Sequence, residues 1–215
     1  MMARVPGYEL LEECADEEAR GNLRDLVRIN RWFGGHSITA GVLRSLSPPP
    51  RFTMLDVGAA SGDTARAVRE TFPGASVVSL DVRLRNLETA PAPRVAADGF
   101  SLPFRQGSFD YVFCSLLLHH FDEADAALLL RRMFAAAGRA LIACDLERSR
   151  IGAAWLPATH PLLRWHPVTL HDGPASVRSA YRRPEMEAIA RRAGLRNVRM
   201  RGHWPWCRWS LVATR

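Results

Sequence analysis

Apolar residues recur at helical spacing through the first part of the chain, from residue 8 to residue 47. Leu23, Leu26 and Phe33 fall on one helical stripe, and Asn30 lies in the middle of it. A polar residue at such an inward position is either a hydrogen-bonded core residue or part of a pocket wall. A run of three prolines then ends the helical region, because proline lacks an N–H and restricts the residue before it.

After the prolines, short apolar runs alternate with helical patterns. The predicted strands are 53–57, 77–80, 94–97, 109–114 and 140–144, and the predicted helices between them are 64–72, 84–89 and 122–137. A helix over 184–193 follows, and the segments 198–202 and 209–213 predict a closing hairpin. Strands that alternate with helices favour a mostly parallel sheet with helices on both faces.

The chain is expected to divide into two parts. Residues 1–50 form an N-terminal helical cap, and residues 51–215 form one α/β domain. Within that domain, residues 146–181 are rich in proline, histidine and tryptophan, and we expect them to be irregular. Long segments of this kind within a compact domain usually serve as lids or binding elements, so this insertion and the N-terminal helices are expected to cover a ligand.

Composition excludes several classes of function. The sequence contains no lysine, so all 29 basic residues are arginine. A pyridoxal phosphate Schiff base and a P-loop both require lysine, and neither is available. The four cysteines form no close pair, which excludes a zinc ribbon and a disulfide framework. The histidines between 160 and 171 match no compact ligand spacing, so no metal site is predicted.

The charge and hydropathy of the chain indicate a cytoplasmic protein with a basic surface. Its net charge is +7, but the arginines are spread in pairs over predicted helix faces, which makes a nucleic-acid partner unlikely. The longest apolar runs are far shorter than the roughly 18 residues that a membrane span requires. Acidic residues stand where a signal peptide would have its apolar core. The oligomeric state is left open.

The turn after the first predicted strand has the features of a ligand-binding loop. It reads DVGAASGD over residues 56–63 and passes directly into a helix, whose free N–H groups attract a carboxylate or phosphate. Gly58 and Gly62 allow a tight turn and a close approach of ligand to backbone. A dinucleotide fingerprint would require further glycines where Ala60 and Asp63 stand, which disfavours an NAD-dependent oxidoreductase.

Three further segments follow at informative spacing. The second strand ends in Asp81, the sequence VAADGFSLPF over residues 95–104 leads into SFDYV over 108–112, and CSLLLHHF spans residues 114–121. With the first loop, these segments resemble the class I S-adenosylmethionine-dependent methyltransferases. They are most similar to the type 11 set of quinone biosynthesis and small-molecule tailoring. The resemblance covers about residues 53–145, and Ala60 departs from it, since the family has glycine there.

The resemblance implies a Rossmann-like class I methyltransferase fold: a mostly parallel seven-stranded sheet with helices on both faces and an antiparallel C-terminal hairpin. It implies S-adenosyl-L-methionine as cofactor and S-adenosyl-L-homocysteine as product. The cofactor-binding residues that it implies are Asp56, Gly58, Ala59, Gly62, Asp81, Val82, Asp98, Gly99 and Cys114. Asp81 would bind the ribose hydroxyls and Asp98 the adenine amino group. We expect Asp56 to hold the loop and the amino group of the cofactor, and Arg31 is a candidate for its carboxylate.

The predicted reaction is methyl transfer to a small-molecule acceptor. The acceptor is expected to be an aromatic or polyketide-like hydroxyl, or an activated ring carbon. If a proton must be removed, His120 is the first candidate for the base and His171, beside Asp172, is the second. Neighbouring residues point in different directions, so His119 is not expected to share a role with His120. An RNA-directed methyltransferase and a catalytically inactive binding module remain as alternatives.

Overall fold

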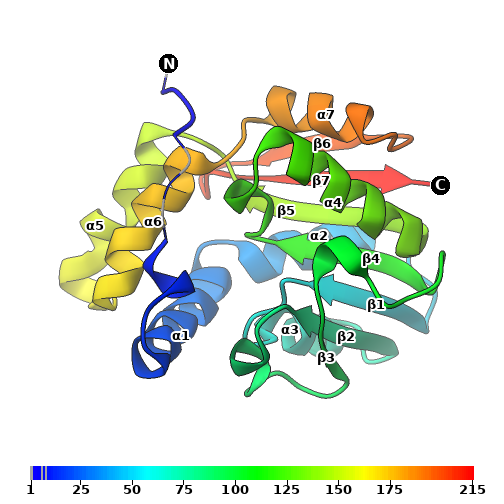
Figure 1. Cartoon of the computed structure of the whole chain (residues 1–215), viewed down its shortest axis with the longest axis horizontal. Helices are drawn as coiled ribbons and strands as arrows, with labels where there is room; N and C mark the ends of the chain where they lie inside the picture. Colours follow the sequence, from blue (N-terminus) through cyan, green and yellow to red (C-terminus); the bar gives the residue numbers. More distant parts are fainter. Residues whose placement is uncertain (1, 6, 8) are drawn as a thin grey trace.

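The computed structural model describes residues 2–5, 7 and 9–215, and its centre is one seven-stranded sheet (Figure 1). The strand order is β3-β2-β1-β4-β5-β7-β6. The strands are β1 (Phe52–Val57), β2 (Ala75–Asp81), β3 (Arg94–Ala96), β4 (Phe109–Ser115), β5 (Ala137–Leu146), β6 (Arg199–His203) and β7 (Arg208–Thr214). Strands β1 to β5 run parallel to one another, whereas β7 pairs antiparallel with both β5 and β6. The predicted fold class is therefore confirmed.

Helices surround the sheet. They are α1 (Asp16–Trp32), α2 (Gly35–Ser45), α3 (Asp63–Thr71), α4 (Glu123–Ala136), α5 (Arg150–Leu163), α6 (Pro167–Ser179) and α7 (Arg183–Arg192). Short 3₁₀ turns are η1 (Leu10–Glu12), η2 (Leu84–Leu87), η3 (Gly99–Ser101) and η4 (Leu118–His120). In Figure 1, α1, α5 and α6 gather on the left, beside one end of the sheet.

Strand alternation divides the core into two layers. On one face, Met54 and Phe113 pack with Leu43 of α2 and Val68 of α3. On the other face, the intervening positions of the same strands pack with α4 and α7. Members of that second layer include Leu55, Val112, Leu141, Leu130 and Ile189. Since side chains of a strand point alternately to opposite faces, each central strand is buried on both sides and reads as an almost continuous apolar run.

The segment between β5 and α7 differs from its prediction. We expected residues 146–181 to be irregular, but the structure forms two helices there, α5 and α6. Pro157, Pro161 and Pro174 lie inside these helices and misled the sequence interpretation, since interior proline usually breaks a helix. The two helices pack against each other, and α6 also packs against α1 and η1. Tertiary packing of this kind overrides local propensity.

The two N-terminal helices have different environments. Ile38, Val42 and Leu43 of α2 belong to the apolar core beside the sheet. In contrast, α1 leans on α6, where Asn22 donates to the hydroxyl of Thr169 over 3.3 Å. Arg28 of α1 donates to the carbonyl of Leu163 at the end of α5. The helices α1, α5 and α6 thus form one connected wall at the end of the sheet.

Among the described residues, no helix is both long and apolar enough to cross a membrane.

Candidate functional site

A cavity of about 720 Å³ lies where the parallel strands end, between the sheet and the wall of α1, α5 and α6. This is where open parallel sheets usually bind ligands. Its sheet side is formed by the loops after β1, β2, β3 and β4. Its helical side includes Asn22, Ile29, Asn30 and Phe33 of α1, Trp155 and Leu156 of α5, and Thr169, Asp172, Ser176 and Val177 of α6. The volume is within the range of small-molecule sites.

The loop after β1 forms the floor of this cavity. Gly58 has φ 71°, and a Cβ built on it would lie 2.9 Å from Cδ1 of Leu117, so glycine is required there. Ala60 also has a positive φ, 45°, in the position where the family has glycine. Its N–H donates to Oδ2 of Asp81 over 3.0 Å, which ties the loop to the end of β2. Gly58, Ala59 and Ala60 all line the cavity.

Gly62 has a different role from the predicted one. Its φ is 68°, and an added Cβ would lie 2.7 Å from Cβ of Ala90, on the side of the loop away from the ligand. Gly62 is not among the lining residues, whereas its neighbours Ser61 and Asp63 are. This glycine therefore allows the chain to turn into α3 and to pack closely on residues 90–91, and it does not present backbone to the cavity.

Asp56 lies at the end of β1 with a buried and unsatisfied carboxylate. The residue is 2% exposed, lines the cavity, and its Oδ2 has no hydrogen-bond partner. Burial, followed by the negative charges of Asp63 and Asp81, raises the pKa of Asp56 well above its usual range. We expected this carboxylate to accept hydrogen bonds from the loop, and it does not. A cationic ligand group in the cavity would satisfy the carboxylate.

Asp81 ends β2 and faces the cavity as predicted. Its two oxygens accept from the N–H groups of Ala60 and Arg83, and the side chain of Asn86 donates to Oδ1 over 3.2 Å. These bonds fix the carboxylate in one orientation, and its remaining lone pairs could accept further hydrogen bonds from a ligand. Val82, next in the chain, also lines the cavity and is 67% exposed.

Asp98, the third of the predicted acids, and Gly99 follow β3. Both residues line the cavity. Oδ1 of Asp98 accepts the N–H of Phe100 over 2.9 Å and caps the 3₁₀ turn η3. The carboxylate therefore stands at the rim in a fixed position, with acceptor capacity left for a ligand.

The structure does not bring Arg31 or Cys114 to the cavity. On α1 the helical period turns Ile29, Asn30 and Phe33 inward, so that Arg31 lies on the exposed face of the helix. Cys114 is 1% exposed and packs in the apolar core, because strand alternation directs its side chain to the face of the sheet that α4 and α7 cover. The lining of this part of the cavity comes instead from residues 115–117, directly after β4.

A buried arginine from the last strand lines the cavity where Arg31 does not. Arg208 of β7 is 1% exposed and lines the cavity, and its Nη1 has no hydrogen-bond partner. Its Nη2 donates to Oδ1 of Asn30 over 3.2 Å. Asn30 donates in turn to Asp63, which also lies 2.8 Å from Nε2 of His36. Asn30 is thus both hydrogen-bonded and part of the pocket wall, and the unpaired Nη1 is available to a ligand carboxylate.

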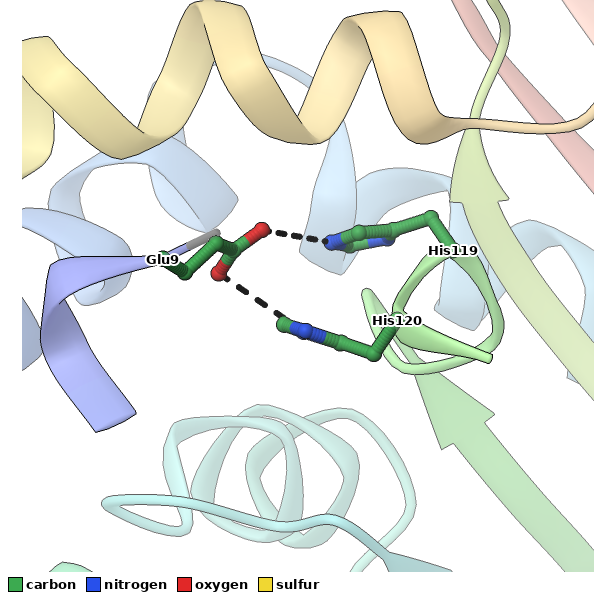
Figure 2. A group of neighbouring side chains, drawn as sticks. All are labelled: Glu9, His119 and His120. Atoms are coloured by element: carbon green, nitrogen blue, oxygen red, sulfur yellow. Dashed lines mark ion pairs between the residues drawn. The ribbon is translucent and has the colours of Figure 1, made fainter. Parts of the chain in front are cut away.

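Glu9, His119 and His120 converge in the wall of the cavity (Figure 2). Nε2 of His119 lies 3.4 Å from Oε1 of Glu9, and Nε2 of His120 lies 3.8 Å from Oε2. The two imidazole rings stack with centroids 4.3 Å apart. The expectation that the two histidines point in different directions is therefore wrong, because the 3₁₀ turn η4 places both rings against the same carboxylate.

Asp145, at the end of β5, holds this group from behind. Its Oδ1 lies 2.7 Å from Nδ1 of His119, and its Oδ2 accepts the N–H of Leu118. Burial alone would lower the pKa of His119, but the charges and hydrogen bonds of Asp145 and Glu9 raise it to about 10. Burial likewise opposes ionisation of Glu9, yet the two imidazoles and Ser176 lower its pKa to about 2. These two carboxylates favour the protonated form of His119, which makes it a poor general base.

His171 makes its expected contact but lies outside the cavity. Its Nδ1 is 2.8 Å from Oδ1 of Asp172, and its side chain is 50% exposed on α6. Asp172 and Gly173 line the cavity, while His171 does not. The carboxylate of Asp172 is also bound by the N–H groups of Leu10 and Leu11, so its role is to fasten the N-terminal segment to α6.

Aromatic side chains cover the cavity from the helical side. The ring of Trp155 on α5 meets the ring of Phe33, directly after α1, edge to face with the ring centroids 5.3 Å apart. The centroid of the Trp206 ring lies 6.2 Å from that of the same phenylalanine. All three line the cavity, as does Phe121 after η4. Sequence interpretation indicated only that the segment 146–181, which contains Trp155, is rich in tryptophan, and it did not find Glu9, Trp206 or Arg208. Flat apolar walls of this kind suit an aromatic ligand.

Comparison with known proteins finds similarity to methyltransferases, in agreement with the resemblance of the motifs. Residues 55–142 match the family model described as "Methyltransferase domain". A malonyl-[acyl-carrier protein] O-methyltransferase of Methylococcus capsulatus is 29% identical over 175 residues, which are 77% of this chain and 59% of the relative. The chain thus spans about three fifths of the length of that curated relative.

Solved structures share the fold at low identity. Magnesium protoporphyrin IX methyltransferase of Synechocystis PCC 6803, with bound S-adenosylhomocysteine, aligns with a TM-score of 0.62 and 17% identity, over 88% of this chain and 85% of its own. Human N-acetylserotonin methyltransferase, in complex with S-adenosylmethionine, aligns with a TM-score of 0.64 and 16% identity, over 90% of this chain and 54% of its own.

Proposed function

We propose that the chain is a class I S-adenosylmethionine-dependent methyltransferase that transfers a methyl group to a small-molecule acceptor, because residues 55–142 match a methyltransferase family model and a curated methyltransferase is similar over most of the chain. The acceptor atom is an aromatic or polyketide-like hydroxyl oxygen, or an activated ring carbon. One observation carries this proposal. Two buried polar atoms without a hydrogen-bond partner, Oδ2 of Asp56 and Nη1 of Arg208, belong to residues that line the same cavity.

These two groups fit the amino-acid end of S-adenosylmethionine. Asp56 would bind its ammonium group, and Arg208 would bind its carboxylate, so each buried charge gains an opposite one. Asp81 would accept hydrogen bonds from the two ribose hydroxyls. Asp98 and the backbone of Gly99 would meet the adenine ring at the rim. When bound, the cofactor supplies an electrophilic methyl group on a sulfonium.

The residues of the chain contribute mainly by orientation. Methyl displacement requires the acceptor in line with the breaking carbon–sulfur bond, and holding two reactants in that geometry supplies much of the rate. The aromatic wall of Phe33, Trp155 and Trp206 would hold the acceptor and exclude water. His120, which lines the cavity beside Glu9, is the side chain that we place next to the acceptor hydroxyl.

Calorimetric titration of the purified chain tests the proposal. S-adenosylmethionine and S-adenosylhomocysteine should bind with one-to-one stoichiometry, and NAD should not bind. Turnover of aromatic hydroxyl compounds, followed as S-adenosylhomocysteine release, then separates an enzyme from an inactive binding module. Failure of both cofactor forms to bind would refute the proposal, and methylation of RNA in place of small molecules would establish the alternative substrate class.

We predict that Asp81→Ala raises the dissociation constant of S-adenosylmethionine at least tenfold, which corresponds to roughly 1.4 kcal/mol. Affinity falls because the ribose hydroxyls and the N–H of Ala60 would both lose the carboxylate that accepts their hydrogen bonds. Calorimetry measures the change. Asp110→Ala is a suitable control, since its carboxylate bonds Thr53 at the amino end of β1, far along the strand from the loop. Unchanged affinity in a folded Asp81 variant would remove this residue from the site.

Replacing Asp56 with asparagine should have opposite effects on the stability of the cofactor-free protein and on cofactor affinity. Because its pKa is raised in the folded state, ionisation destabilises the cofactor-free protein as the pH rises above the pKa of an ordinary aspartate. Asp56→Asn should therefore increase the free energy of unfolding at pH 8 by about 1–3 kcal/mol, with a smaller gain in acid. The same variant should bind the cofactor at least tenfold more weakly, about 1.4 kcal/mol, because the ammonium loses its counter-charge.

Denaturant unfolding at pH 5 and pH 8, with calorimetry of the cofactor, measures both effects. A variant that is less stable than the wild type at pH 8 would show that the carboxylate is satisfied in the free protein. In that case the unpaired acid would no longer argue for a cationic ligand group.

A further inference from the structure

We propose that Glu9, His119 and His120 form a binding site for a divalent transition-metal ion at the acceptor side of the cavity. The three side chains offer two imidazole nitrogens and one carboxylate, and their ligand atoms all lie within 4.8 Å of one another. Figure 2 shows both rings directed at the same carboxylate, one ring toward each oxygen. Two histidines and one carboxylate are a recurring ligand set for Fe²⁺, Zn²⁺ and related ions.

The distances in this group favour an ion between the ligands over direct hydrogen bonds. The two nitrogen–oxygen separations are 3.4 Å and 3.8 Å. A hydrogen bond from N–H to oxygen usually measures about 2.7–3.2 Å, so the contact of His119 is at most a weak hydrogen bond and that of His120 is too long for one. Ligands that each lie about 2.0–2.2 Å from a shared ion are separated from one another by about 3–3.5 Å. A small contraction of the group would therefore complete the site.

The surroundings orient the ligands as metal sites require. Nδ1 of His119 is bound by Asp145 at 2.7 Å, which leaves its Nε2 directed at Glu9. A carboxylate on the far nitrogen of a ligating histidine fixes the ring and its tautomer. Glu9 is held too, because the hydroxyl of Ser176 donates to its Oε1 over 2.5 Å. The three ligands come from two distant segments, and α6 and β5 support them from behind.

The remaining coordination positions face the cavity. Glu9, His119 and His120 all line it, and His120 is the most exposed of the three, with 25% of its side chain accessible. An ion held there would accept an oxygen of the acceptor. It would lower the pKa of that hydroxyl, so that the proton passes to water before the methyl carbon bonds the oxygen. This role rests on the proposed function, whereas ion binding does not, and it favours a hydroxyl over a ring carbon as acceptor.

The test is metal titration of the chelator-treated protein without cofactor or acceptor. Zn²⁺ should bind with a stoichiometry of one by calorimetry, and Co²⁺ should give visible absorption bands with nitrogen and oxygen ligands. Glu9→Gln and His120→Ala should each weaken Zn²⁺ binding at least about a hundredfold, and Asp145→Asn about ten- to a hundredfold. His203→Gln, a control histidine that bonds Ser210 on the hairpin, should bind like the wild type.

Cofactor affinity of each variant, measured separately, shows that the cavity remains folded. Absence of stoichiometric Zn²⁺ binding in a wild type that binds S-adenosylmethionine would overturn the metal site and leave the proposed function standing. Equal Zn²⁺ binding by the wild type, Glu9→Gln and His120→Ala would also overturn it. Zn²⁺ binding by these residues in a chain that binds no S-adenosylmethionine would support the site and refute the methyl transfer.

Discussion

Replacing Arg208 with glutamine is expected to weaken S-adenosylhomocysteine binding about a hundredfold, or roughly 2.7 kcal/mol. Arg208 is buried in the cavity wall and has one unpaired nitrogen, Nη1. A ligand carboxylate there would form a charge-assisted pair away from water, and removing one partner of such a pair costs about 3–5 kcal/mol. Glutamine keeps a donor near Asn30, so part of the loss should be offset. Calorimetry at constant pH measures the difference.

A second ligand makes this prediction specific. 5′-Methylthioadenosine has the adenosine and sulfur of the cofactor but no amino-acid group. It should bind the wild type and Arg208→Gln with equal affinity, because Arg208 has no carboxylate to meet. If both ligands lose the same free energy in the variant, the substitution has disturbed the cavity as a whole. Arg208 would then be a structural residue, and the carboxylate would bind elsewhere.

The sheet and the cofactor loops could be predicted because their signals are local in sequence. The central strands are buried on both faces and read as apolar runs. Asp56 and Asp81 lie at the ends of β1 and β2, and Asp98 follows β3 closely. The ends of parallel strands meet at one edge, so residues at those ends line the same cavity without knowledge of long-range packing. Gly58 was predictable for a similar reason, since the tight turn after β1 requires a positive φ.

The other half of the site depends on contacts between distant segments. Glu9 lies 110 residues before His119, and Arg208 is 178 residues from Asn30, so no spacing in the sequence relates them. The acidic N-terminal stretch was interpreted only as evidence against a signal peptide. Arg31 was chosen because it stands beside a helix break, and Arg208 was not considered. Helical period alone would have excluded it, since the inward stripe includes Asn30 and Phe33.

Cys114 shows an error that the sequence itself could have corrected. The family segment begins at this cysteine, but in β4 alternate side chains face opposite layers. Val112 and Cys114 pack in the same apolar layer, so Cys114 is a core residue, and the ligand contacts begin one residue later at Ser115. The helices α5 and α6 were not predictable in this way, because their interior prolines contradict their conformation.

His120→Ala is expected to lower methyl transfer to a hydroxyl acceptor about a hundredfold or more, roughly 2.7 kcal/mol in the barrier. His120 lines the cavity and meets Glu9, and it is not among the residues that we propose to bind the cofactor. Affinity for S-adenosylmethionine should therefore stay unchanged while turnover falls. Single-turnover release of S-adenosylhomocysteine, measured at saturating cofactor, separates the chemical step from binding.

His171→Ala is the matched comparison, because His171 is also a histidine beside a carboxylate but lies half-exposed outside the cavity. It should retain full turnover. If His171→Ala loses activity and His120→Ala does not, α6 must rotate to present the other histidine, and the acceptor site has been placed on the wrong residues. If both variants keep full turnover on a hydroxyl acceptor, no side chain of this group assists proton removal. Catalysis would then rest on the alignment of the acceptor with the methyl group alone.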